Sequence, residues 1–411
     1  MTNHYKQKGS DLLEKCLIVL VIFFIGIFNA YALEIASEHA VMYNLNDGTI
    51  VFEKNKDEVT KVASLNKIMT TLVAIEQIDN LNETVVVNDN MFYGLYEEGA
   101  AVIGLVNGQV VTYEDLLYGT FISSGADATR ALTISLAGSE DDFVKLMNQK
   151  ANILGLTNTH FVNATGLDAE GQISTVDDVA KLLMYALKND LFKTIFESQT
   201  YDFKDSSLKL YSTLYNTSIK YGIDTDIIEG AKTGYTDEAG LCLASVAHDT
   251  KNDIKYLLVT AKAPVNGYPY HVEDALKIYD YYFSNYKYYN VVKKDEELIN
   301  LDTKYNKVKN ITIKADKDIT LYYDNTFNKD LVTFDYNGPE KISPNFKKGE
   351  KIGTIDVYYD DKKIDVIDVV LNESIPFSLS EFFKEPENLF PFVLFWGAVL
   401  LVIGRMLKQS M

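Results

Sequence analysis

Two hairpin signals enclose a run of helical segments, and this order constrains the fold of the chain more than any other feature. The first hairpin turns at Asn46-Asp47-Gly48, and the second turns at the polar residues 249–253. The predicted strands of the two hairpins are residues 40–45, 49–53, 239–248 and 254–261. Hairpin strands are antiparallel neighbours, so the sequence predicts an α+β fold with one antiparallel sheet covered by helices.

Between the hairpins, apolar residues recur at the spacing of amphipathic helices. The predicted helices are residues 64–78, 113–122, 127–136, 141–154 and 175–187, and another over 272–283 follows the second hairpin. Thr175 and Asp178 have the spacing of a helix N-cap, which supports the start of the fifth helix. We expect these helices and the sheet to form one domain over residues 33–289.

The sequence pattern changes after about Tyr289, where short alternating runs replace the helical segments. These runs are residues 311–313, 319–322, 331–336, 352–359 and 364–371, with a turn at Asp360-Asp361. Alternation of this kind is typical of half-buried strands. The sequence therefore predicts a small C-terminal all-β domain over residues 290–375, followed by a linker over residues 376–388.

Both ends of the chain carry apolar segments. Lysines precede the apolar run Cys16–Phe28 and Ala30-Tyr31-Ala32 follows it, which predicts a cleaved signal peptide over residues 1–32, with an uncleaved anchor as the alternative. Residues 389–404 are uncharged and basic residues follow them, so we expect a transmembrane anchor over residues 389–407, with an interfacial helix as the alternative. The basic residues place the C-terminus inside the cell and the domains outside the membrane.

Composition excludes several classes of function. The formal net charge of −19 excludes the basic surface that nucleic-acid binding needs, so no nucleic-acid partner is expected. Once the signal peptide is removed, Cys242 has no second cysteine for an intramolecular disulfide. The histidines are scattered without the spacing of metal ligands, and no phosphate-binding glycine motif is present. The sequence therefore predicts neither a metal nor a cofactor.

Three short motifs carry the chemistry of this chain: Ser64-Leu65-Asn66-Lys67, Ser124-Gly125-Ala126 and Lys232-Thr233-Gly234. Residues three apart on a helix are neighbours, so the amine of Lys67 lies within reach of the Ser64 hydroxyl. A lysine takes a proton from serine only when burial or a nearby cation lowers the pKa of the amine. Lys232 is a candidate for that cation, and Ser124 offers a second hydroxyl for proton transfer.

Each motif alone is too short to be specific. Ser64 and Lys67 also fit a helix N-cap followed by a surface lysine, and Lys232-Thr233-Gly234 also fits a turn before a strand. Their order and setting are more specific, since the first motif lies on an apolar helix, the second follows one and the third leads into a strand. This set of motifs is typical of penicillin-binding proteins and class A β-lactamases.

Residues 33–375 resemble the low-molecular-weight penicillin-binding proteins, which are serine-type D-alanyl-D-alanine carboxypeptidases. The resemblance extends to residues 63–70, 111–119, 155–161, 166–168 and 230–240. It implies a penicillin-binding-protein-like fold and removal of the terminal D-alanine from peptidoglycan stem pentapeptides at the bacterial plasma membrane. Residues 127–231 lack the Glu-x-x-Leu-Asn segment of class A β-lactamases, which argues against efficient penicillin hydrolysis.

The resemblance also implies a role for each motif residue. Lys67 deprotonates Ser64, which forms an acyl-enzyme with the stem peptide or with a β-lactam. Ser124 then passes a proton to the leaving D-alanine. Lys232 and Thr233 hold the substrate carboxylate, and the N–H groups of Ser64 and Tyr235 hold the oxyanion. The residues expected to bind the substrate are Lys232, Thr233, Gly234 and Tyr235.

Two departures from the family pattern bear on activity. The second motif usually reads Ser-x-Asn, whereas Ala126 takes the place of the asparagine here. Loss of one positioning contact predicts a slower or differently selective enzyme, and the alternative is a degenerate protein with a binding or scaffolding role in the cell wall. The catalytic domain also has no arginine beyond Lys232, so Lys232, Lys262 or a hydroxyl such as that of Thr233 must hold a substrate carboxylate.

Overall fold

The computed structural model describes residues 33–204 and 207–409. The chain divides into two compact units after Tyr282, near the change of sequence pattern at about Tyr289. The first unit contains the three motifs, and the second contains the β-rich segment and the C-terminal helix. The signal peptide expected over residues 1–32 lies outside the described residues.

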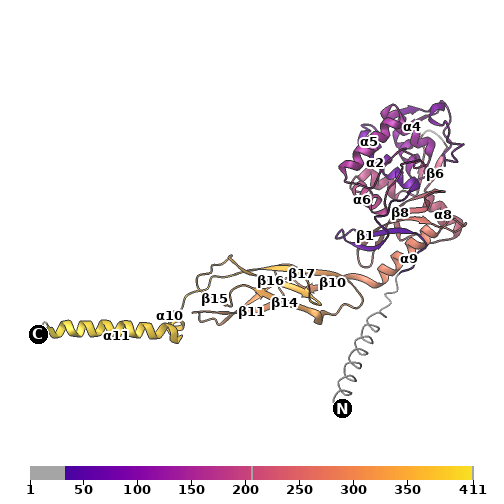
Figure 1. Cartoon of the computed structure of the whole chain (residues 1–411). Coiled ribbons are helices and arrows are strands. Elements are labelled where there is room, and N and C mark those ends of the chain that lie inside the picture. Colours follow the sequence, from indigo (N-terminus) through magenta and orange to yellow (C-terminus); the bar gives the residue numbers. More distant parts are fainter. Residues whose placement is uncertain (1–32, 205–206, 410–411) are drawn as a thin grey trace, which may run out of the picture. The chain divides into compact units, whose positions relative to one another are not determined.

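A five-stranded antiparallel sheet forms the base of the first unit (Figure 1). Its order is β2-β1-β9-β8-β7, so both predicted hairpins join one sheet. The strands are β1 (His39–Asn44), β2 (Ile50–Lys54), β7 (Ile228–Thr236), β8 (Gly240–Asp249) and β9 (Ile254–Ala263). The edge strand β7 carries the Lys232-Thr233-Gly234 motif. One side of β7 therefore has no strand partner within the described chain.

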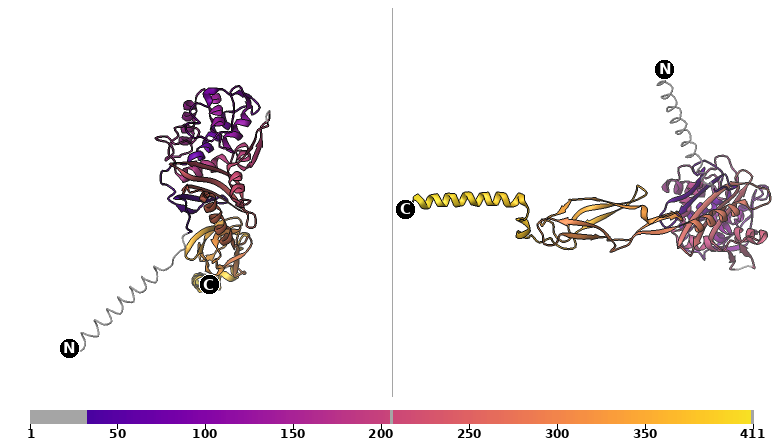
Figure 2. Two further views of the ribbon diagram at one scale, coloured as in Figure 1. Left: turned by 90° about the vertical axis from the view of Figure 1, so that its right-hand side faces the viewer. Right: turned by 90° about the horizontal axis from the view of Figure 1, so that it is seen from below.

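Helices cover both faces of this sheet, and most of them lie together on one side (Figure 1, Figure 2). They are α2 (Lys67–Gln77), α3 (Tyr113–Phe121), α4 (Ala126–Ala137), α5 (Glu140–Ile153), α6 (Val176–Ala186), α7 (Asp190–Glu197), α8 (Thr213–Tyr221) and α9 (Tyr270–Asn285). Val41, Val259 and Ala244 form a row across the sheet and belong to the core shared with α2 to α7. On the opposite face, the hydroxyl of Tyr279 on α9 lies 2.9 Å from Ser245 Oγ.

The predicted helices of the first unit are confirmed, with one local difference. Residues Ala63–Asn66 form a 3₁₀ turn, η1, and the α-helix begins only at Lys67. Thr175 caps α6 by accepting a hydrogen bond from the Asp178 nitrogen at 3.0 Å, as expected. The sequence patterns did not reveal α7, α8, or the short strand pairs β3 (Thr84–Val86) with β4 (Val110–Thr112) and β5 (Thr200–Asp202) with β6 (Lys209–Tyr211). These elements are too short to show a clear period.

The second unit is built mainly of strands, which confirms the predicted all-β domain. They are β10 (Tyr286–Val292), β11 (Glu297–Thr303), β12 (Asn310–Lys314), β13 (Ile319–Asp324), β14 (Val332–Asn337), β15 (Lys341–Ile342), β16 (Lys351–Tyr359) and β17 (Lys362–Val370). Asp360 and Asp361 join β16 to β17 with φ angles of 47° and 60°. Two positive φ angles are what a two-residue type I′ hairpin turn requires, so the predicted turn is confirmed.

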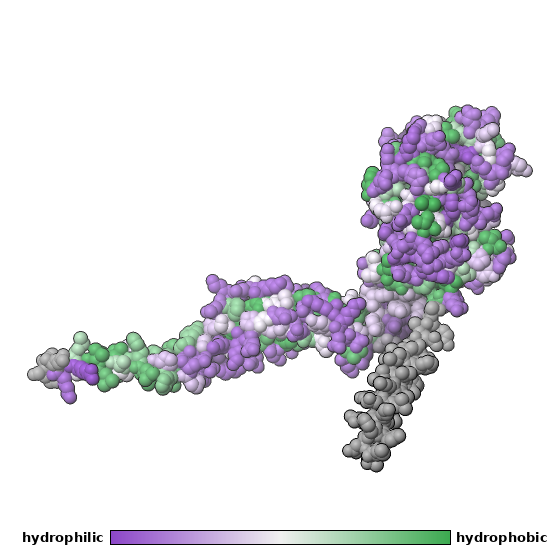
Figure 3. Space-filling view, viewed as in Figure 1, coloured by the Kyte–Doolittle hydropathy of each residue, from purple (hydrophilic) through white to green (hydrophobic). Residues whose placement is uncertain are grey.

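The chain ends in the short helix α10 (Leu379–Phe382) and the long helix α11 (Pro386–Gln409). The 24 residues of α11 extend about 36 Å, which exceeds the hydrocarbon thickness of about 30 Å. Within residues 386–408, the most apolar 18-residue window has a mean hydropathy of 2.0, and none of it is buried. Figure 3 shows a hydrophobic surface along most of this helix. Such a helix is compatible with a C-terminal membrane anchor.

Candidate active site

Ser64 lies in the tight turn η1, between β7 and the loop that contains Gly166. Ala63, directly before Ser64, has a φ of 48°, a left-handed conformation that costs a non-glycine residue about 1 kcal/mol or more. A Cβ on Gly234 would lie 2.9 Å from the Ser64 nitrogen, and a Cβ on Gly166 would overlap the Ala63 carbonyl oxygen. The two glycines therefore let β7 and the loop approach closely enough to hold the strained turn.

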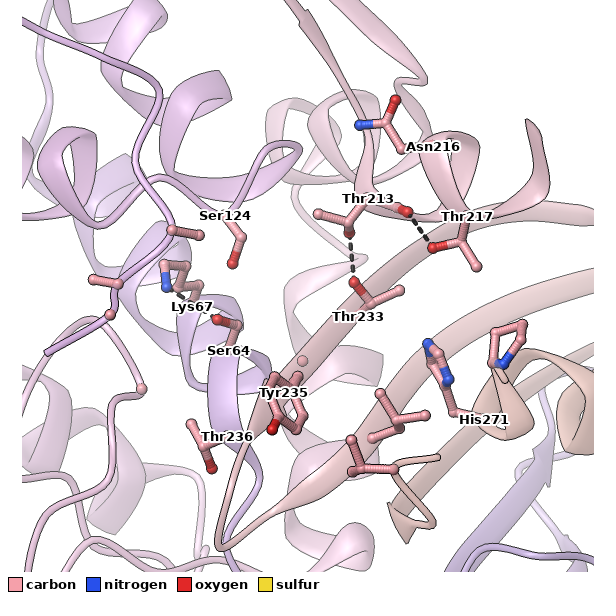
Figure 4. Close-up of a pocket in the computed structure, with 18 of the residues that line it drawn as sticks. Ser64, Lys67, Ser124, Thr213, Asn216, Thr217, Thr233, Tyr235, Thr236 and His271 are labelled. Carbon is pink, nitrogen blue, oxygen red and sulfur yellow. Dashed lines mark hydrogen bonds between the residues drawn. The ribbon is translucent and has the colours of Figure 1, made fainter. Parts of the chain in front are cut away.

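The side chain of Lys67 turns from the start of α2 toward Ser64 (Figure 4). Its Nζ donates hydrogen bonds to Ser64 Oγ, at 3.2 Å, and to the carbonyl oxygen of Thr165. Lys67 is only 2% exposed, and this burial lowers the pKa of its amine to about 7, against the opposing effect of Glu140 and Asp127. Burial, rather than a neighbouring cation, is thus the main reason that a large share of Lys67 is neutral at neutral pH, as a general base requires.

The loop that orients the Lys67 amine is fixed along η1 and α2. Asn66 Nδ2 donates to the carbonyl oxygen of Asn163 at 2.8 Å, and Thr70 Oγ1 donates to that of Ala164 at 2.7 Å. The next carbonyl along this loop, that of Thr165, accepts the hydrogen bond from Lys67. The side chains of Asn66 and Thr70 therefore fix the loop whose Thr165 carbonyl oxygen orients the amine toward Ser64.

Ser124 follows α3 and directs its hydroxyl toward Ser64 and Lys67 (Figure 4). Its φ is 60°, and its buried Oγ has no hydrogen-bond partner within the described chain. Asp127 holds the neighbouring loop by accepting hydrogen bonds of 2.9 to 3.0 Å from the backbone N–H groups of Ile103, Gly104 and Leu105. A buried hydroxyl without a partner costs free energy, so Ser124 is held ready for a group that enters the site.

Lys232 is completely enclosed by protein. Its side chain is 1% exposed, and its Nζ donates to the Thr233 carbonyl oxygen at 2.9 Å. Burial, followed by the charge of Lys67, lowers the pKa of Lys232 well below its usual value. Side chains alternate along β7, so Lys232 and Gly234 face inward while Thr233 and Tyr235 face the other way. Lys232 is therefore absent from the described lining of the adjacent pocket.

Thr233 and Tyr235 present their side chains at the exposed side of β7 (Figure 4). Thr233 Oγ1 donates to Thr213 Oγ1 on α8 at 2.6 Å. Tyr235 is half exposed, and its hydroxyl donates to Asp237 at 2.5 Å. The backbone between these two residues lies at the free edge of the sheet, where an extended peptide can pair with the strand.

A pocket of about 510 Å³ opens beside Ser64. It brings together six of the seven predicted site residues, which are Ser64, Lys67, Ser124, Thr233, Gly234 and Tyr235. Ala126, which stands where the family motif has asparagine, also lines the pocket. The described lining contains no aspartate or glutamate, although the chain has a formal net charge of −19. The electrostatics of the pocket therefore favour a ligand that carries negative charge.

One wall of the pocket was not predicted from the sequence. It is formed by α8 and the segment leading into α9, and its residues include Thr213, Asn216, Thr217, Lys220, Val265, Tyr268 and His271. The polar residues of α8 recur at positions that share one helix face, which is a weak local signal for this wall. Tyr221 of α8 donates its hydroxyl to the Gly267 carbonyl oxygen at 3.0 Å, so tertiary contacts bring the two parts of the wall together.

Comparison with known proteins finds a family match for each unit. Residues 27–264 match the D-alanyl-D-alanine carboxypeptidase family, and residues 286–376 match the C-terminal domain of penicillin-binding protein 5. The D-alanyl-D-alanine carboxypeptidase DacF of Bacillus subtilis is 30% identical over 330 residues, which cover 78% of this chain and 80% of that protein. DacA of Escherichia coli (strain K12) is 30% identical over 353 residues, 84% of each protein.

Solved structures show the same fold. Penicillin-binding protein 5 from Haemophilus influenzae aligns with a TM-score of 0.60 at 23% identity and covers 84% of this chain and 98% of its own. The DD-transpeptidase of Streptomyces K15 aligns with a TM-score of 0.55 at 27% identity and covers 61% of this chain and 98% of its own. These matches confirm the predicted fold class. With the family match over more than half of its length, this chain belongs to the D-alanyl-D-alanine carboxypeptidase family of serine hydrolases.

Proposed function

We propose that this chain removes the terminal D-alanine from peptidoglycan stem pentapeptides through an acyl-enzyme at Ser64. The observation that carries the proposal is the hydrogen bond between Ser64 Oγ and a buried lysine amine with a pKa of about 7. Membership of the family supports the reaction class. The absence of carboxylates from the described pocket lining suits a peptide that ends in a carboxylate.

Acylation begins with neutral Lys67 taking the proton of the Ser64 hydroxyl. Ser64 Oγ forms a bond to the carbonyl carbon of the penultimate D-alanine, and the carbonyl electron pair moves onto oxygen. In this proposal the backbone N–H groups of Ser64 and Tyr235 stabilise that oxyanion. The extended peptide binds along the free edge of β7, against Thr233, Gly234 and Tyr235. Lys232 positions this part of the strand by donating a hydrogen bond to the carbonyl oxygen of Thr233.

Collapse of the tetrahedral intermediate breaks the C–N bond and releases D-alanine. The leaving nitrogen takes a proton from Lys67 by way of the Ser124 hydroxyl, whose Oγ has no other partner in the described residues. Water then attacks the ester at Ser64 with Lys67 as base, and the shortened peptide departs. A β-lactam acylates Ser64 by the same route and leaves a long-lived adduct.

The proposed site of action is the outer face of the bacterial plasma membrane. The signal sequence expected over residues 1–32 exports the chain, and α11 anchors it with the two preceding domains outside the cell. Glu387 lies in the first turn of α11 and Lys408 in its last turn, which agrees with the predicted orientation. The length and hydropathy of α11 support this anchor.

The direct test is D-alanine release from a synthetic stem pentapeptide by the purified chain. We expect turnover in the wild type and none with Ser64→Ala or Lys67→Ala, which remove the nucleophile and its base. Lys251→Ala, in the turn between β8 and β9, is a matched control that should leave turnover unchanged. A wild-type chain that releases no D-alanine and takes up no fluorescent penicillin would contradict the proposal.

A second candidate, a wall-binding protein without catalysis, rests on Ala126. This residue is 2% exposed and lines the pocket at the position where the family carries an asparagine amide. We predict that Ala126→Asn increases the rate of Ser64 acylation about 10- to 1000-fold, since it restores one positioning contact in a site that already has its nucleophile and base. Stopped-flow acylation with a fluorescent penicillin measures this rate. Acylation in Ala126→Asn but none in the wild type would favour the non-catalytic candidate.

A further inference from the structure

The pocket has an unusual balance of charge for this protein. Acidic residues outnumber basic ones by 58 to 39 in the chain, yet the described lining has no acidic side chain and two lysines, Lys67 and Lys220. Most of the lysines around the first unit are held in ion pairs, as Lys255 is with Glu229 at 2.7 Å. A cation that faces the pocket without an acidic partner is therefore available to a bound anion.

Other cations of the first unit are committed elsewhere. Lys232 is buried and bonded to the Thr233 carbonyl oxygen, and Lys262 pairs with Glu38 at 3.3 Å outside the pocket lining. Arg130 is held by Glu98 and Glu140. Neither of the lysines named in the sequence for the substrate carboxylate thus reaches the pocket surface in this structure.

His271 does not supply the missing positive charge. It lines the pocket from the first turn of α9 and is 5% exposed. Its Nδ1 has no hydrogen-bond partner in the described chain, and burial lowers the pKa of the ring to about 4, with Asp274 opposing the shift. The ring is therefore neutral at pH 7. It lines the pocket without adding positive charge.

Lys220 lies on the polar face of α8 that borders the pocket. Thr213, on the same face, bonds to Thr233 at 2.6 Å, and Thr217 lies between Thr213 and Lys220 in the helix. Lys220 stands about 4.5 Å along the helix from Thr217, and helical side chains lean toward the N-terminus, so its amine can reach an anion beside Thr217. No ion pair of the described residues involves it, and its Nζ lies 4.9 Å from the centre of the neighbouring Tyr221 ring.

We propose that Lys220 receives the terminal carboxylate of the substrate, together with the hydroxyls of Thr233 and Thr217. Lys220 is then a specificity residue that distinguishes a free C-terminus from a blocked one. This inference rests on the proposed function for the identity of the ligand. It keeps the hydroxyl of Thr233 from the sequence expectation but replaces Lys232 or Lys262 with Lys220 as the cation.

Equilibrium binding separates this inference from catalysis. The protein is the full chain in detergent micelles with Ser64→Ala, which prevents turnover. The ligands are two forms of one acetylated peptide ending in D-Ala-D-Ala, the first with a free carboxylate and the second with a carboxamide. We expect the Ser64→Ala parent to bind the acid more tightly than the amide. Adding Lys220→Ala to this parent should weaken acid binding about tenfold and leave amide binding unchanged. Lys220→Arg should keep the preference, as should the control Lys251→Ala.

The outcomes are distinct. If Lys220→Ala binds the acid as tightly as its parent does, or if the parent binds acid and amide equally, the inference is wrong. Unchanged amide binding shows that the variant is folded. If the parent prefers the acid and Lys220→Ala loses this preference, but the wild-type chain releases no D-alanine, the proposed function is refuted and Lys220 remains the carboxylate-binding residue.

Discussion

In the proposed mechanism, the amine of Lys67 determines the pH at which Ser64 becomes a nucleophile. Burial is the main cause of its pKa of about 7. The neutral fraction of the amine therefore falls as the pH drops below 7 and approaches one as the pH rises above 7. We predict that the acylation rate constant falls about tenfold for each pH unit below 7 and levels off above it. Rapid-mixing acylation with a fluorescent penicillin across pH 5 to 9 measures this. A rate that still rises tenfold per unit at pH 9, as a lysine with its usual pKa near 10 would give, would contradict the lowered pKa of Lys67.

The sequence was enough to identify the residues of the motifs, but it was not enough to predict where all of their side chains point. The three-residue spacing of Ser64 and Lys67 agrees with the 3.2 Å contact between them because local helical geometry sets it. Which face of β7 Lys232 occupies depends on the register of that strand, since a shift of one residue reverses every side chain. Gly234 fixes the register, because only glycine fits against the Ser64 nitrogen, and this contact joins segments far apart in the sequence.

At the scale of elements, Arg130 on α4 connects three segments around the site. Its Nε lies 3.1 Å from Glu140 on α5, its Nη2 lies 3.3 Å from Glu98, and its Nη1 donates to the Tyr93 carbonyl oxygen. Glu140 in turn accepts a hydrogen bond of 3.0 Å from the Ala164 nitrogen. Ala164 precedes the residue whose carbonyl accepts from Lys67. The charge of Glu140 therefore acts near the base, and Arg130 partly neutralises it.

This network predicts opposite shifts of the pH profile. Glu140→Gln removes a negative charge that raises the pKa of Lys67, so the acid limb of acylation should move to lower pH by about 0.5 to 1 unit. Arg130→Gln leaves Glu140 without its cation and should move the limb to higher pH by a similar amount. Lys150→Gln breaks a different ion pair of α5, with Glu76, and should leave the limb in place. If both network variants shift the limb in the same direction, the charges of Glu140 and Arg130 do not control the pKa of Lys67 as predicted.

The sheet and the longer helices followed from periodicity, whereas the α8 wall did not. Helix α8 has nine residues, of which only Leu214 is buried, so its apolar pattern is too weak to reveal it. Ser212 and Gly222 cap its two ends, and these local signals were available but unspecific. The segment before α9 meets α8 through the Tyr221 hydroxyl. Residues that line a site from such segments become visible only when tertiary packing is known.

For the whole molecule, the apolar surface of α11 favours a spanning anchor over a helix that lies on the membrane. Its exposed apolar residues occur on all sides, and Figure 3 shows this surface on the side that faces the viewer. We predict that the full chain stays in the membrane pellet after alkaline carbonate extraction, since a spanning helix is not released by loss of surface charge contacts. Immunoblotting of pellet and supernatant measures this. A chain released by carbonate would indicate an interfacial helix.

A matched variant makes this test specific to α11. A chain that ends at residue 385 retains the strands of the second unit and should appear in the soluble fraction with its acylation rate unchanged, because no residue of the described pocket lies in α11. If the shortened chain remains in the pellet, another segment holds the protein at the membrane.

Acylation of Ser64 is tested most directly by the mass of the chain after incubation with benzylpenicillin, followed by peptide mapping. We predict one covalent adduct, with the mass of the intact antibiotic, on the peptide that contains Ser64. Ser64→Ala should carry none, and Lys67→Ala should acquire it far more slowly. An unmodified wild-type chain, or an adduct at any residue other than Ser64, would contradict the assignment of Ser64 as the nucleophile of an acyl-transfer enzyme.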